Sequence, residues 1–490
     1  MNKTNYIMRS IILLSLFFAF ACKRSDVLPP SPVLPVPNQH QVEWQEKELF
    51  AFVHFTVNTF TGKEWGYGDE NPDIFDPVYF NPDQWAKVLK DAGFKGAILT
   101  AKHHDGFCLW PSQFASHSVK NISWMGGKGD VVAGLKDACA KHGLEFGIYL
   151  SPWDRNRADY ASSAYIEYYK NQLNELISSY GPIFEIWFDG ANGGDGYYGG
   201  AREMRKIDDQ VYYNWPQTFK IVRSYNPKTI IRGDARSASD SRWCGNEEGY
   251  IGETNWNMVT PDSLIALGKD KKRLEVLNSG DERGNVWMPA EVDVSIRPGW
   301  FYHESEDSLV KTPDELFDIY LNSIGRGSPL LLNVAPDKRG LIPEPDVQSL
   351  LLWKKKIGDA FANNLTIGAK VTVDSYRGKS NQFAAVNLTD GNKETYWATD
   401  DNIISSSIEL EFEKPQQVQY VLIQENIKLG QRVKSFTIEV LQNGQWEQVA
   451  NATTIGYKRI IRINPVETEK VKINITGAKA CPVISNIEIY

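Results

Sequence analysis

A single carboxylate, Asp189, follows a largely apolar run and precedes a glycine. Residues 183–188 have the composition of a buried strand, and Gly190 then favours a turn, so the chain presents Asp189 at the end of that strand. A carboxylate in this position is suited to work as a catalytic residue. An Asp after a strand also commonly forms a turn or caps a helix, so Asp189 on its own decides nothing.

A second cluster of polar residues follows another apolar run. Residues 96–100 are Gly-Ala-Ile-Leu-Thr, and Lys102, His103, His104 and Asp105 come shortly after them. Because parallel strands carry functional side chains at their carboxyl ends, two strands that end this way predict a barrel with its active site at that face. The competing interpretation places one histidine in the core and the other at the surface.

Between residues 44 and 333, short apolar runs alternate with amphipathic stretches. This pattern predicts repeated strand and helix units that close into a (β/α)8-type barrel. The predicted helices are 83–92, 131–142 and 165–180, each followed by a glycine. The strands that can be distinguished are 49–55, 96–100, 145–150, 183–188, 229–231 and 330–333. The sixth and seventh barrel strands are blurred, that is, the sequence does not define their bounds.

After residue 357 the pattern changes to short alternating strands with Gly, Asn and Asp turns. Runs with period-two alternation at 407–412, 418–423 and 435–440 predict an all-β sandwich. We therefore assign residues 41–357 to the barrel and residues 358–490 to the sandwich.

The first 40 residues are expected to lie outside the fold. Lys3 and Arg9 precede an apolar stretch at 11–20 that is too short to span a bilayer, so residues 1–21 are predicted to be a signal peptide. The residues before Cys22 resemble a bacterial lipobox, which makes Cys22 the lipid attachment site. Residues 22–40 hold five prolines between 29 and 37 and predict an extended tether. The expectation is an exported bacterial lipoprotein, periplasmic or associated with the outer membrane, that touches the membrane only through this anchor.

Composition narrows the class of protein. The 490 residues are 42% hydrophobic and 12% aromatic, enough for two domains with large cores. The formal net charge of −8 provides no basic patch, so no nucleic-acid partner is predicted. Fifteen Trp and 22 Tyr suit stacking against sugars and serve core packing equally well. Cysteines 108, 139, 244 and 481 lack C-x-x-C spacing and are predicted to be free core thiols.

Five motifs of the barrel region together resemble the α-L-fucosidases of glycoside hydrolase family 29. Any one of them occurs easily by chance, but all five occur in order over about 250 residues, which makes the resemblance specific. The motifs are FVHF at 52–55 with Glu64-Trp65, KHHDGF at 102–107, GIYLSPW at 147–153, WFDG at 187–190 and RPGW at 297–300.

The resemblance assigns catalytic roles. It implies that Asp189 is the nucleophile of a retaining glycosidase, which needs a second carboxyl group to protonate the leaving oxygen. RWCGNEEG at 242–249 resembles the Gly-Asn-Glu motif of the α-1,3/1,4-fucosidase branch and makes Glu247 the acid/base, with Glu291 as the reserve candidate. The insert at 193–200 lengthens the chain before Glu247. In the alternative interpretation, Glu247 and Glu248 are ordinary solvated charges of a loop.

The same resemblance implies a set of sugar-binding side chains. Imidazoles can donate or accept hydrogen bonds, carboxylates can grip hydroxyl pairs, and indoles can lie against the apolar faces of a sugar. A metal role for the histidines is not expected, because no third ligand with zinc-like spacing is visible. The residues are His54, Glu64, Trp65, His103, His104, Tyr149, Trp187 and Trp300.

In the sandwich region, NLTDGNKETYW at 387–397 resembles discoidin-like (F5/8 type C) carbohydrate-binding modules. That family often holds a structural calcium ion near the position of Asp390, since carboxylate and carbonyl oxygens suit a hard cation. A simple Asp-Gly turn beside a buried Trp397 is the alternative interpretation. Whether this domain binds sugar or supports the barrel is left open.

The predicted function is that of a retaining exo-α-L-fucosidase. It would remove terminal fucose, α-1,3- or α-1,4-linked, from oligosaccharides or glycoconjugates by double displacement, without a cofactor. One alternative is a carbohydrate-binding lipoprotein without catalysis. The other is a retaining α-L-glycosidase for a related sugar such as an α-L-galactoside, which differs from fucose only at C5.

Overall fold

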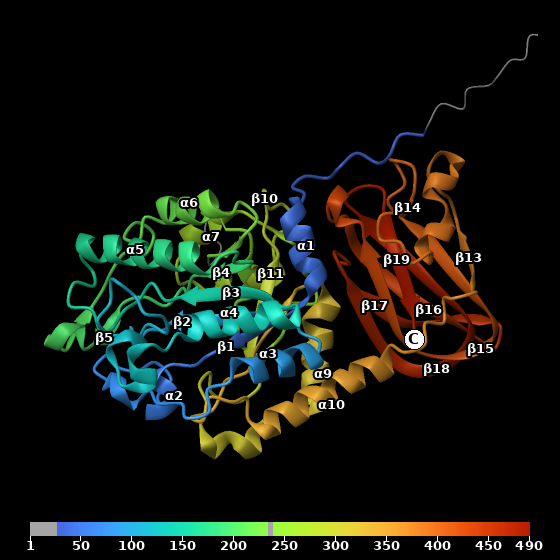
Figure 1. The fold of residues 1–490 in the computed structure, drawn as a ribbon. Coiled ribbons are helices and arrows are strands. Elements are labelled where there is room, and N and C mark those ends of the chain that lie inside the picture. Colours follow the sequence, from blue (N-terminus) through green and yellow to red (C-terminus); the bar gives the residue numbers. More distant parts are fainter. Residues whose placement is uncertain (1–26, 234–238) are drawn as a thin grey trace, which may run out of the picture.

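The computed structural model describes residues 27–233 and 239–490, which form two domains packed side by side (Figure 1). The predicted signal peptide at 1–21 and the lipidated Cys22 lie outside the described residues and stay predictions. Within the described ranges, no helix combines the length and the apolar character needed to cross a membrane.

In the described part of the chain, eight parallel strands form the barrel sheet in the order β7-β4-β3-β2-β1-β12-β11-β8. A parallel bridge between Arg232 and Ser241 joins the two ends of this order and closes the sheet. The fold class is therefore confirmed. The strands are β1 (Leu49–Val53), β2 (Gly96–Lys102), β3 (Glu145–Leu150), β4 (Glu185–Trp187), β7 (Ile230–Arg232), β8 (Arg242–Trp243), β11 (Ala290–Ser295) and β12 (Leu330–Asn333).

Helices surround this sheet, so its strands are buried on both faces and lack polar alternation. Inside the barrel, aromatic and branched side chains such as Phe50, Ile98 and Leu331 pack together with Trp44 of helix α1. The helices are α1 (Gln39–Lys47), α2 (Val57–Thr61), α3 (Pro82–Asp91), α4 (Val131–His142), α5 (Ser163–Tyr180), α6 (Trp215–Tyr225), α7 (Pro261–Leu267), α8 (Lys271–Ser279), α9 (Pro313–Asn322) and α10 (Glu344–Ala360). The described residues also form two small antiparallel sheets beside the barrel: the hairpin of β5 (Gly194–Gly196) with β6 (Glu203–Arg205), and β9 (Met258–Val259) with β10 (Val286–Trp287), which α7 and α8 connect.

Most predicted barrel elements agree with the structure. β3, β12 and α4 have the predicted bounds, and α4 is capped by Asp130, which accepts a hydrogen bond from the Ala133 N–H at 2.8 Å. The two blurred strands are β8 and β11. β8 has only two residues, and the nine positions between it and β7 are fewer than the crossover of an ordinary βαβ unit needs. β11 carries Glu291 and Asp293, which break an apolar run.

The second domain is antiparallel, as predicted, but one strand assignment is wrong. The runs at 407–412 and 418–423 are parts of one long strand, β15, which bends at a register shift between Glu411 and Gln416. Its neighbour β18 is equally long, and the two pair over most of their length. The strands are β13 (Lys370–Val373), β14 (Trp397–Ala398), β15 (Ser406–Glu425), β16 (Val433–Gln442), β17 (Gln445–Ala452), β18 (Arg459–Ala478) and β19 (Val483–Ile489).

The two domains share a packed interface. Tyr420, Leu422 and Ile460 of the sandwich belong to the main apolar cluster of the barrel. Polar contacts surround them: the Tyr457 hydroxyl donates to Glu48 at 2.8 Å, and Lys458 pairs with the same carboxylate. Helix α10 leads from one domain into the other and ends at Ala360, three residues beyond the predicted boundary.

Of the proline-rich segment, residues 27–38 are described and form no helix or strand. Residues 28–33 lie on the sandwich domain, so this part is not the free tether that was predicted. Arg377 donates to the Leu28 carbonyl at 2.7 Å and Arg432 to the Ser31 carbonyl at 2.6 Å. The Val33 N–H donates to the Leu429 carbonyl at 2.9 Å. Proline removes backbone donors but leaves every carbonyl as an acceptor, so arginine side chains can bind the segment.

The loop around Asp390 forms a compact turn. Its two carboxylate oxygens accept hydrogen bonds from the Asn392 N–H at 2.9 Å and the Thr395 hydroxyl at 2.7 Å, beside the buried Trp397. No three His, Cys, Asp or Glu side chains of the described residues come together as a metal-binding group. The Asp-Gly turn accounts for this geometry, and a calcium ion here stays a prediction. The cysteines at 108, 139, 244 and 481 are buried and free, as expected.

Candidate active site

A cavity of about 300 Å³ opens at the carboxyl ends of the barrel strands. All ten side chains predicted to act in catalysis or sugar binding line it, although their positions span about 250 residues of sequence. The two predicted catalytic residues, Asp189 and Glu247, share this cavity with His54, Glu64, Trp65, His103, His104, Tyr149, Trp187 and Trp300.

Asp189 follows β4 and turns its carboxylate toward the cavity, with 22% of the side chain exposed. The Tyr149 hydroxyl donates to Oδ2 at 2.8 Å, and the Ala191 N–H donates to Oδ1 at 2.7 Å. His104 Nε2 lies 3.6 Å from Oδ2. One donor on each oxygen fixes the plane of the carboxylate, which a nucleophile needs in order to approach one carbon atom.

Glu247 is an exposed residue of the cavity lining and lies on the loop after β8. Trp300 Nε1 donates to its Oε2 at 3.2 Å. Solvent reaches the residue, yet the surrounding side chains remove enough water to raise the pKa of its carboxyl, and the negative charge of Asp189 adds to the rise. Trp300 and Arg232 act in the other direction. A carboxyl group with a raised pKa beside a second carboxylate is suited to donate a proton.

Glu291, the reserve acid/base candidate, does not line the cavity. It is 1% exposed and lies behind Trp187, whose Nε1 donates to Glu291 Oε2 at 3.0 Å. Because a general acid must reach the oxygen that it protonates, this position disfavours Glu291 for that role.

Hydrogen bonds on the far side of two imidazole rings fix their tautomers. Asn333 donates its amide to the Trp300 carbonyl at 2.8 Å, so its oxygen accepts from His54 Nδ1 at 2.7 Å. The Ser151 hydroxyl donates to the Trp153 carbonyl at 2.7 Å and therefore accepts from His104 Nδ1 at 2.7 Å. Burial lowers the pKa of His54 to about 3 and that of His104 to about 4. Both neutral rings therefore keep Nε2 as an acceptor for a sugar hydroxyl.

His103 packs between its neighbours and makes no hydrogen bond to another described residue. Its ring stacks on Tyr149 with the centroids 5.6 Å apart and is 4.2 Å from the ring of His104. Burial lowers its pKa well below the usual value, and the neighbouring histidines add to this effect. A neutral, unpartnered imidazole on the cavity wall is available to a ligand.

Glu64 binds the loop that carries Trp300. Its carboxylate accepts from the Trp300 N–H at 2.8 Å and lies 2.6 Å from His303 Nε2. Glu64 also lines the cavity, so it reaches both the loop and a ligand. Trp65, the next residue, is 51% exposed and stands edge-on to His104. The loops after β1 and β11 therefore support each other at the rim.

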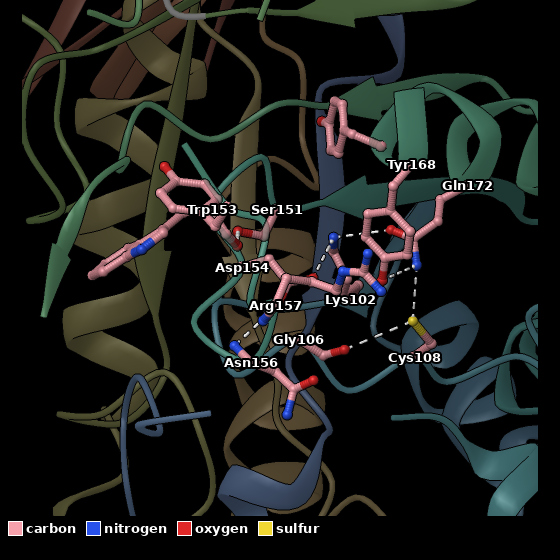
Figure 2. Close-up of polar contacts among 12 residues, drawn as sticks. Lys102, Gly106, Cys108, Ser151, Trp153, Asp154, Asn156, Arg157, Tyr168 and Gln172 are labelled. Atoms are coloured by element: carbon pink, nitrogen blue, oxygen red, sulfur yellow. Dashed lines mark hydrogen bonds and ion pairs between the residues drawn. The ribbon is translucent and has the colours of Figure 1, made fainter. Parts of the chain in front are cut away.

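Lys102, which precedes the two histidines, does not line the cavity and belongs to a buried polar cluster with Asp154 and Gln172 (Figure 2). Its Nζ lies 3.1 Å from Asp154 Oδ2 and donates to Gln172 Oε1 at 2.9 Å, and both charged side chains are almost fully buried. Asp154 Oδ1 accepts from the Asn156 and Arg157 N–H groups, so one ion pair joins the loops after β2 and β3. These loops carry His103 and His104 on one side and Ser151 and Trp153 on the other.

Gly106 allows this close approach. A Cβ atom at this position would lie 2.3 Å from Asp154 Oδ1, and the backbone has a φ of +80°, which side chains rarely adopt. The glycine of the KHHDGF motif is thus required by packing against the ion pair. It has no catalytic part.

The cavity also contains residues that sequence reasoning did not select. Arg232 extends β7 by one residue beyond the predicted strand, and its guanidinium lies 3.6 Å from the centroid of the Trp187 ring. Burial raises the pKa of Asp293 on β11 to about 8. Phe52, Gly190 and Trp243 lie within the quoted motifs but were not selected, whereas Arg232, Arg273 and Asp293 lie outside them. The additional lining residues are Phe52, Gly190, Ala191, Arg232, Trp243, Arg273 and Asp293.

The insert at 193–200 folds into the β5–β6 hairpin region beside the cavity. Asp195 pairs with Arg155 at 2.8 Å, and Gly194 lies against the Trp153 ring. The insert thus packs on the loop after β3, and Glu247 still reaches the cavity.

Comparisons with known proteins agree with this geometry. Residues 33–359 match the family described as Alpha-L-fucosidase, and residues 370–489 match the F5/8 type C domain. The chain is 41% identical over 466 residues to alpha-L-fucosidase 1 of Arabidopsis thaliana, covering 94% of this chain and 88% of that protein. The crystal structure of a glycoside hydrolase 29 family member from an unknown rumen bacterium has a TM-score of 0.84 at 42% identity, covering 94% of this chain and 78% of that one. For a Ruminococcus gnavus GH29 fucosidase the values are 0.85 and 32%, with 95% and 97% covered.

Two carboxyl groups that line one cavity at a barrel mouth, among imidazole and indole rings, are typical of a glycoside hydrolase. The matches over both domains narrow this class: the chain belongs to the α-L-fucosidases of glycoside hydrolase family 29 and carries a C-terminal F5/8 type C domain.

Removing either partner of the Lys102–Asp154 pair should destabilise the barrel. Lys102→Met or Asp154→Ala leaves one buried charge without its partner, so we expect the free energy of unfolding to fall by about 3–5 kcal/mol. The double variant Lys102→Met/Asp154→Leu should lose less than the two single losses combined. Urea unfolding followed by circular dichroism measures both.

The exposed Lys87–Asp91 pair is the matched control. Lys87→Met should change the unfolding free energy by no more than about 0.5 kcal/mol. Losses of equal size at the buried and exposed pairs would contradict a structural role for Lys102.

The three cavity histidines should stay neutral in weakly acidic solution. In the folded protein, the chemical shifts of their ring protons should not titrate between pH 8 and 5, because burial lowers all three pKa values. As the pH falls from 6.5 toward about 4, these histidines become protonated in the unfolded chain but stay neutral in the folded protein. Each group then lowers the free energy of unfolding by about 1.4 kcal/mol per pH unit.

NMR of histidine-labelled protein measures these titrations, and the protein unfolded in urea is the reference. A cavity imidazole that titrates with a midpoint near 6.5 in the folded state would contradict the expected tautomers.

Proposed function

We propose that this α-L-fucosidase works by double displacement with net retention, with Asp189 as nucleophile and Glu247 as acid/base. The observation that supports the proposal is the different environment of two carboxyl groups in one cavity. Asp189 is held by a donor on each oxygen, whereas the pKa of the Glu247 carboxyl is raised. Groups whose surroundings differ in this way take the separate parts of nucleophile and acid.

In the first step, an oxygen of Asp189 forms a bond to the anomeric carbon while the bond to the leaving oxygen breaks. Glu247 gives its proton to that oxygen, and the sugar becomes an ester of Asp189. In the second step, Glu247, now a carboxylate, takes a proton from water, whose oxygen attacks the same carbon. Asp189 leaves as a carboxylate, and the sugar regains its original configuration.

Terminal fucose on an oligosaccharide or glycoconjugate is the proposed substrate. The similar Ruminococcus gnavus fucosidase is described in complex with fucose. In this chain the cavity offers His54 and His104 as hydrogen-bond acceptors and the rings of Phe52 and Trp187 as an apolar wall. A wall of this kind suits the C5 methyl group of fucose better than the hydroxymethyl group of an α-L-galactoside.

For the linkage, we infer a preference for α-1,3- and α-1,4-linked fucose. The support is the RWCGNEEG segment, which brings Glu247 to the cavity rim as its resemblance to that branch implies. The alternative of a binding protein without catalysis is less well supported, because both carboxyl groups reach the cavity.

The two catalytic assignments predict different losses. Asp189→Ala should lower kcat by about four orders of magnitude on every substrate, since no covalent intermediate forms. Glu247→Ala should impair natural fucosides far more than aryl fucosides with a good leaving group, because those need little protonation. Steady-state kinetics on one aryl fucoside and one fucosylated oligosaccharide measure both losses.

Glu248→Ala is the matched control, because Glu248 is the exposed neighbour of Glu247 and does not line the cavity. It should keep near-normal rates. An Asp189→Ala variant with substantial kcat would contradict the nucleophile assignment. Equal losses of Glu247→Ala on both substrates would contradict its role as acid/base.

Linkage and stereochemistry can be tested together. The enzyme should release fucose from α-1,3- and α-1,4-linked oligosaccharides at least about tenfold faster, in kcat/KM, than from α-1,2-linked ones. NMR of the first product should show the α-anomer before mutarotation. A β-anomer would contradict retention, faster release of α-1,2-linked fucose would contradict the branch, and faster cleavage of aryl α-L-galactoside would change the sugar.

A further inference from the structure

Two glutamates face each other inside the barrel, below the floor of the active site. Glu185 begins β4 and Glu291 lies on β11, and their exposed fractions are 0% and 1%. Their side chains come within hydrogen-bonding reach of each other. Neither residue lines the cavity, so the proposed double displacement makes no use of either carboxyl group.

Each glutamate has one oxygen with a donor and one without. Trp44 Nε1 donates to Glu185 Oε2 at 2.7 Å, and Trp187 Nε1 donates to Glu291 Oε2 at 3.0 Å. The remaining oxygens, Oε1 of both residues, are buried and have no hydrogen-bond partner in the described structure. Two acceptor oxygens at close range repel each other unless a proton lies between them.

The surroundings favour holding that proton. Burial raises the pKa of Glu291 to about 7, and burial together with the charge of Glu291 raises that of Glu185. Arg232 on β7 is the cation that acts on both groups, and Asp293 lies above them on β11. Two buried carboxylates near one guanidinium leave an excess negative charge, which one bound proton removes.

We propose that Glu185 and Glu291 share one proton and thereby act as a positioning pair that sets the Trp187 ring at the floor of the fucose site. Trp187 lines the cavity two residues before Asp189 on the same strand end. Its ring contacts the Arg232 guanidinium, 3.6 Å from the centroid, and the rings of Phe52 and Tyr149, 5.3 and 5.5 Å away. These contacts are non-directional compared with the hydrogen bond from Nε1 to Glu291, which restrains the orientation of the indole.

Two variants of Glu291 distinguish the effect of its side-chain length from the effect of its charge. Glu291→Gln keeps the length of the side chain: the amide can donate to Glu185, and its oxygen can accept from Trp187. Glu291→Asp keeps the charge but withdraws the acceptor by one methylene group. We expect kcat/KM of the Gln variant on an aryl fucoside to stay within about threefold of the wild type. For the Asp variant we expect KM to rise about tenfold with a smaller change in kcat.

The controls distinguish this role from others. Glu425→Gln alters a buried carboxyl of the sandwich domain whose pKa is also raised to about 7, and it should leave KM and kcat unchanged. Glu185→Gln should match Glu291→Gln, because one amide can supply the shared hydrogen from either side. Thermal unfolding of each variant confirms that it is folded before kinetics are compared.

Two results would overturn the inference. One is a Gln variant as impaired as the Asp variant, above all if natural fucosides suffer more than aryl fucosides, which would make Glu291 an acid/base. The other is an Asp variant with wild-type KM. The inference rests on the proposed contact between Trp187 and the sugar, but the anomer formed by the wild-type enzyme tests the mechanism separately.

Discussion

The ion pair between Lys102 and Asp154 joins the two loops, after β2 and β3, that carry much of the active site. A lysine without water is stable only when its charge is matched, and here one carboxylate, one amide oxygen and three tyrosine rings surround it. Because Asp154 also binds backbone N–H groups of its own loop, the pair fixes two loops at once. His103 and His104 line the cavity, whereas Lys102 beside them packs against helix α5.

A second pattern is the placement of carboxyl groups at graded depth. Glu247 stands at the rim, Asp189 on the wall, Asp293 on the floor and the Glu185–Glu291 pair beneath it. Asp293 and Glu291 are almost fully buried, and burial raises the pKa of Asp293 to about 8 and that of Glu291 to about 7. Arg232 lies among the deeper groups and limits their combined charge. The barrel thus has reactive carboxyl groups in its cavity and buried carboxyl groups of low net charge in its interior.

The sequence reveals those parts of the molecule whose signals are local. β3 and β12 are continuous apolar runs, and helix α4 has both its cap and its terminal glycine, so their bounds agree with the structure. The ten predicted site residues could be found because they lie in short motifs at strand ends. β11 was blurred because its inward residues are Glu291 and Asp293, whose partners are distant in sequence. Arg232 and Arg273 lie in no motif, and Trp243 lies in the RWCGNEEG segment, where only Glu247 was selected.

The seating of residues 28–33 on the sandwich has a consequence for biosynthesis. Ser31 meets Arg432 across a separation of 401 positions, and Val33 meets Leu429. Neither contact can form until the ribosome has completed almost the entire polypeptide, and closing so long a loop costs entropy that only a finished sandwich can offset. Residues 28–33 are therefore secured last, and a nascent chain remains accessible to proteases at this point until its final strands have folded.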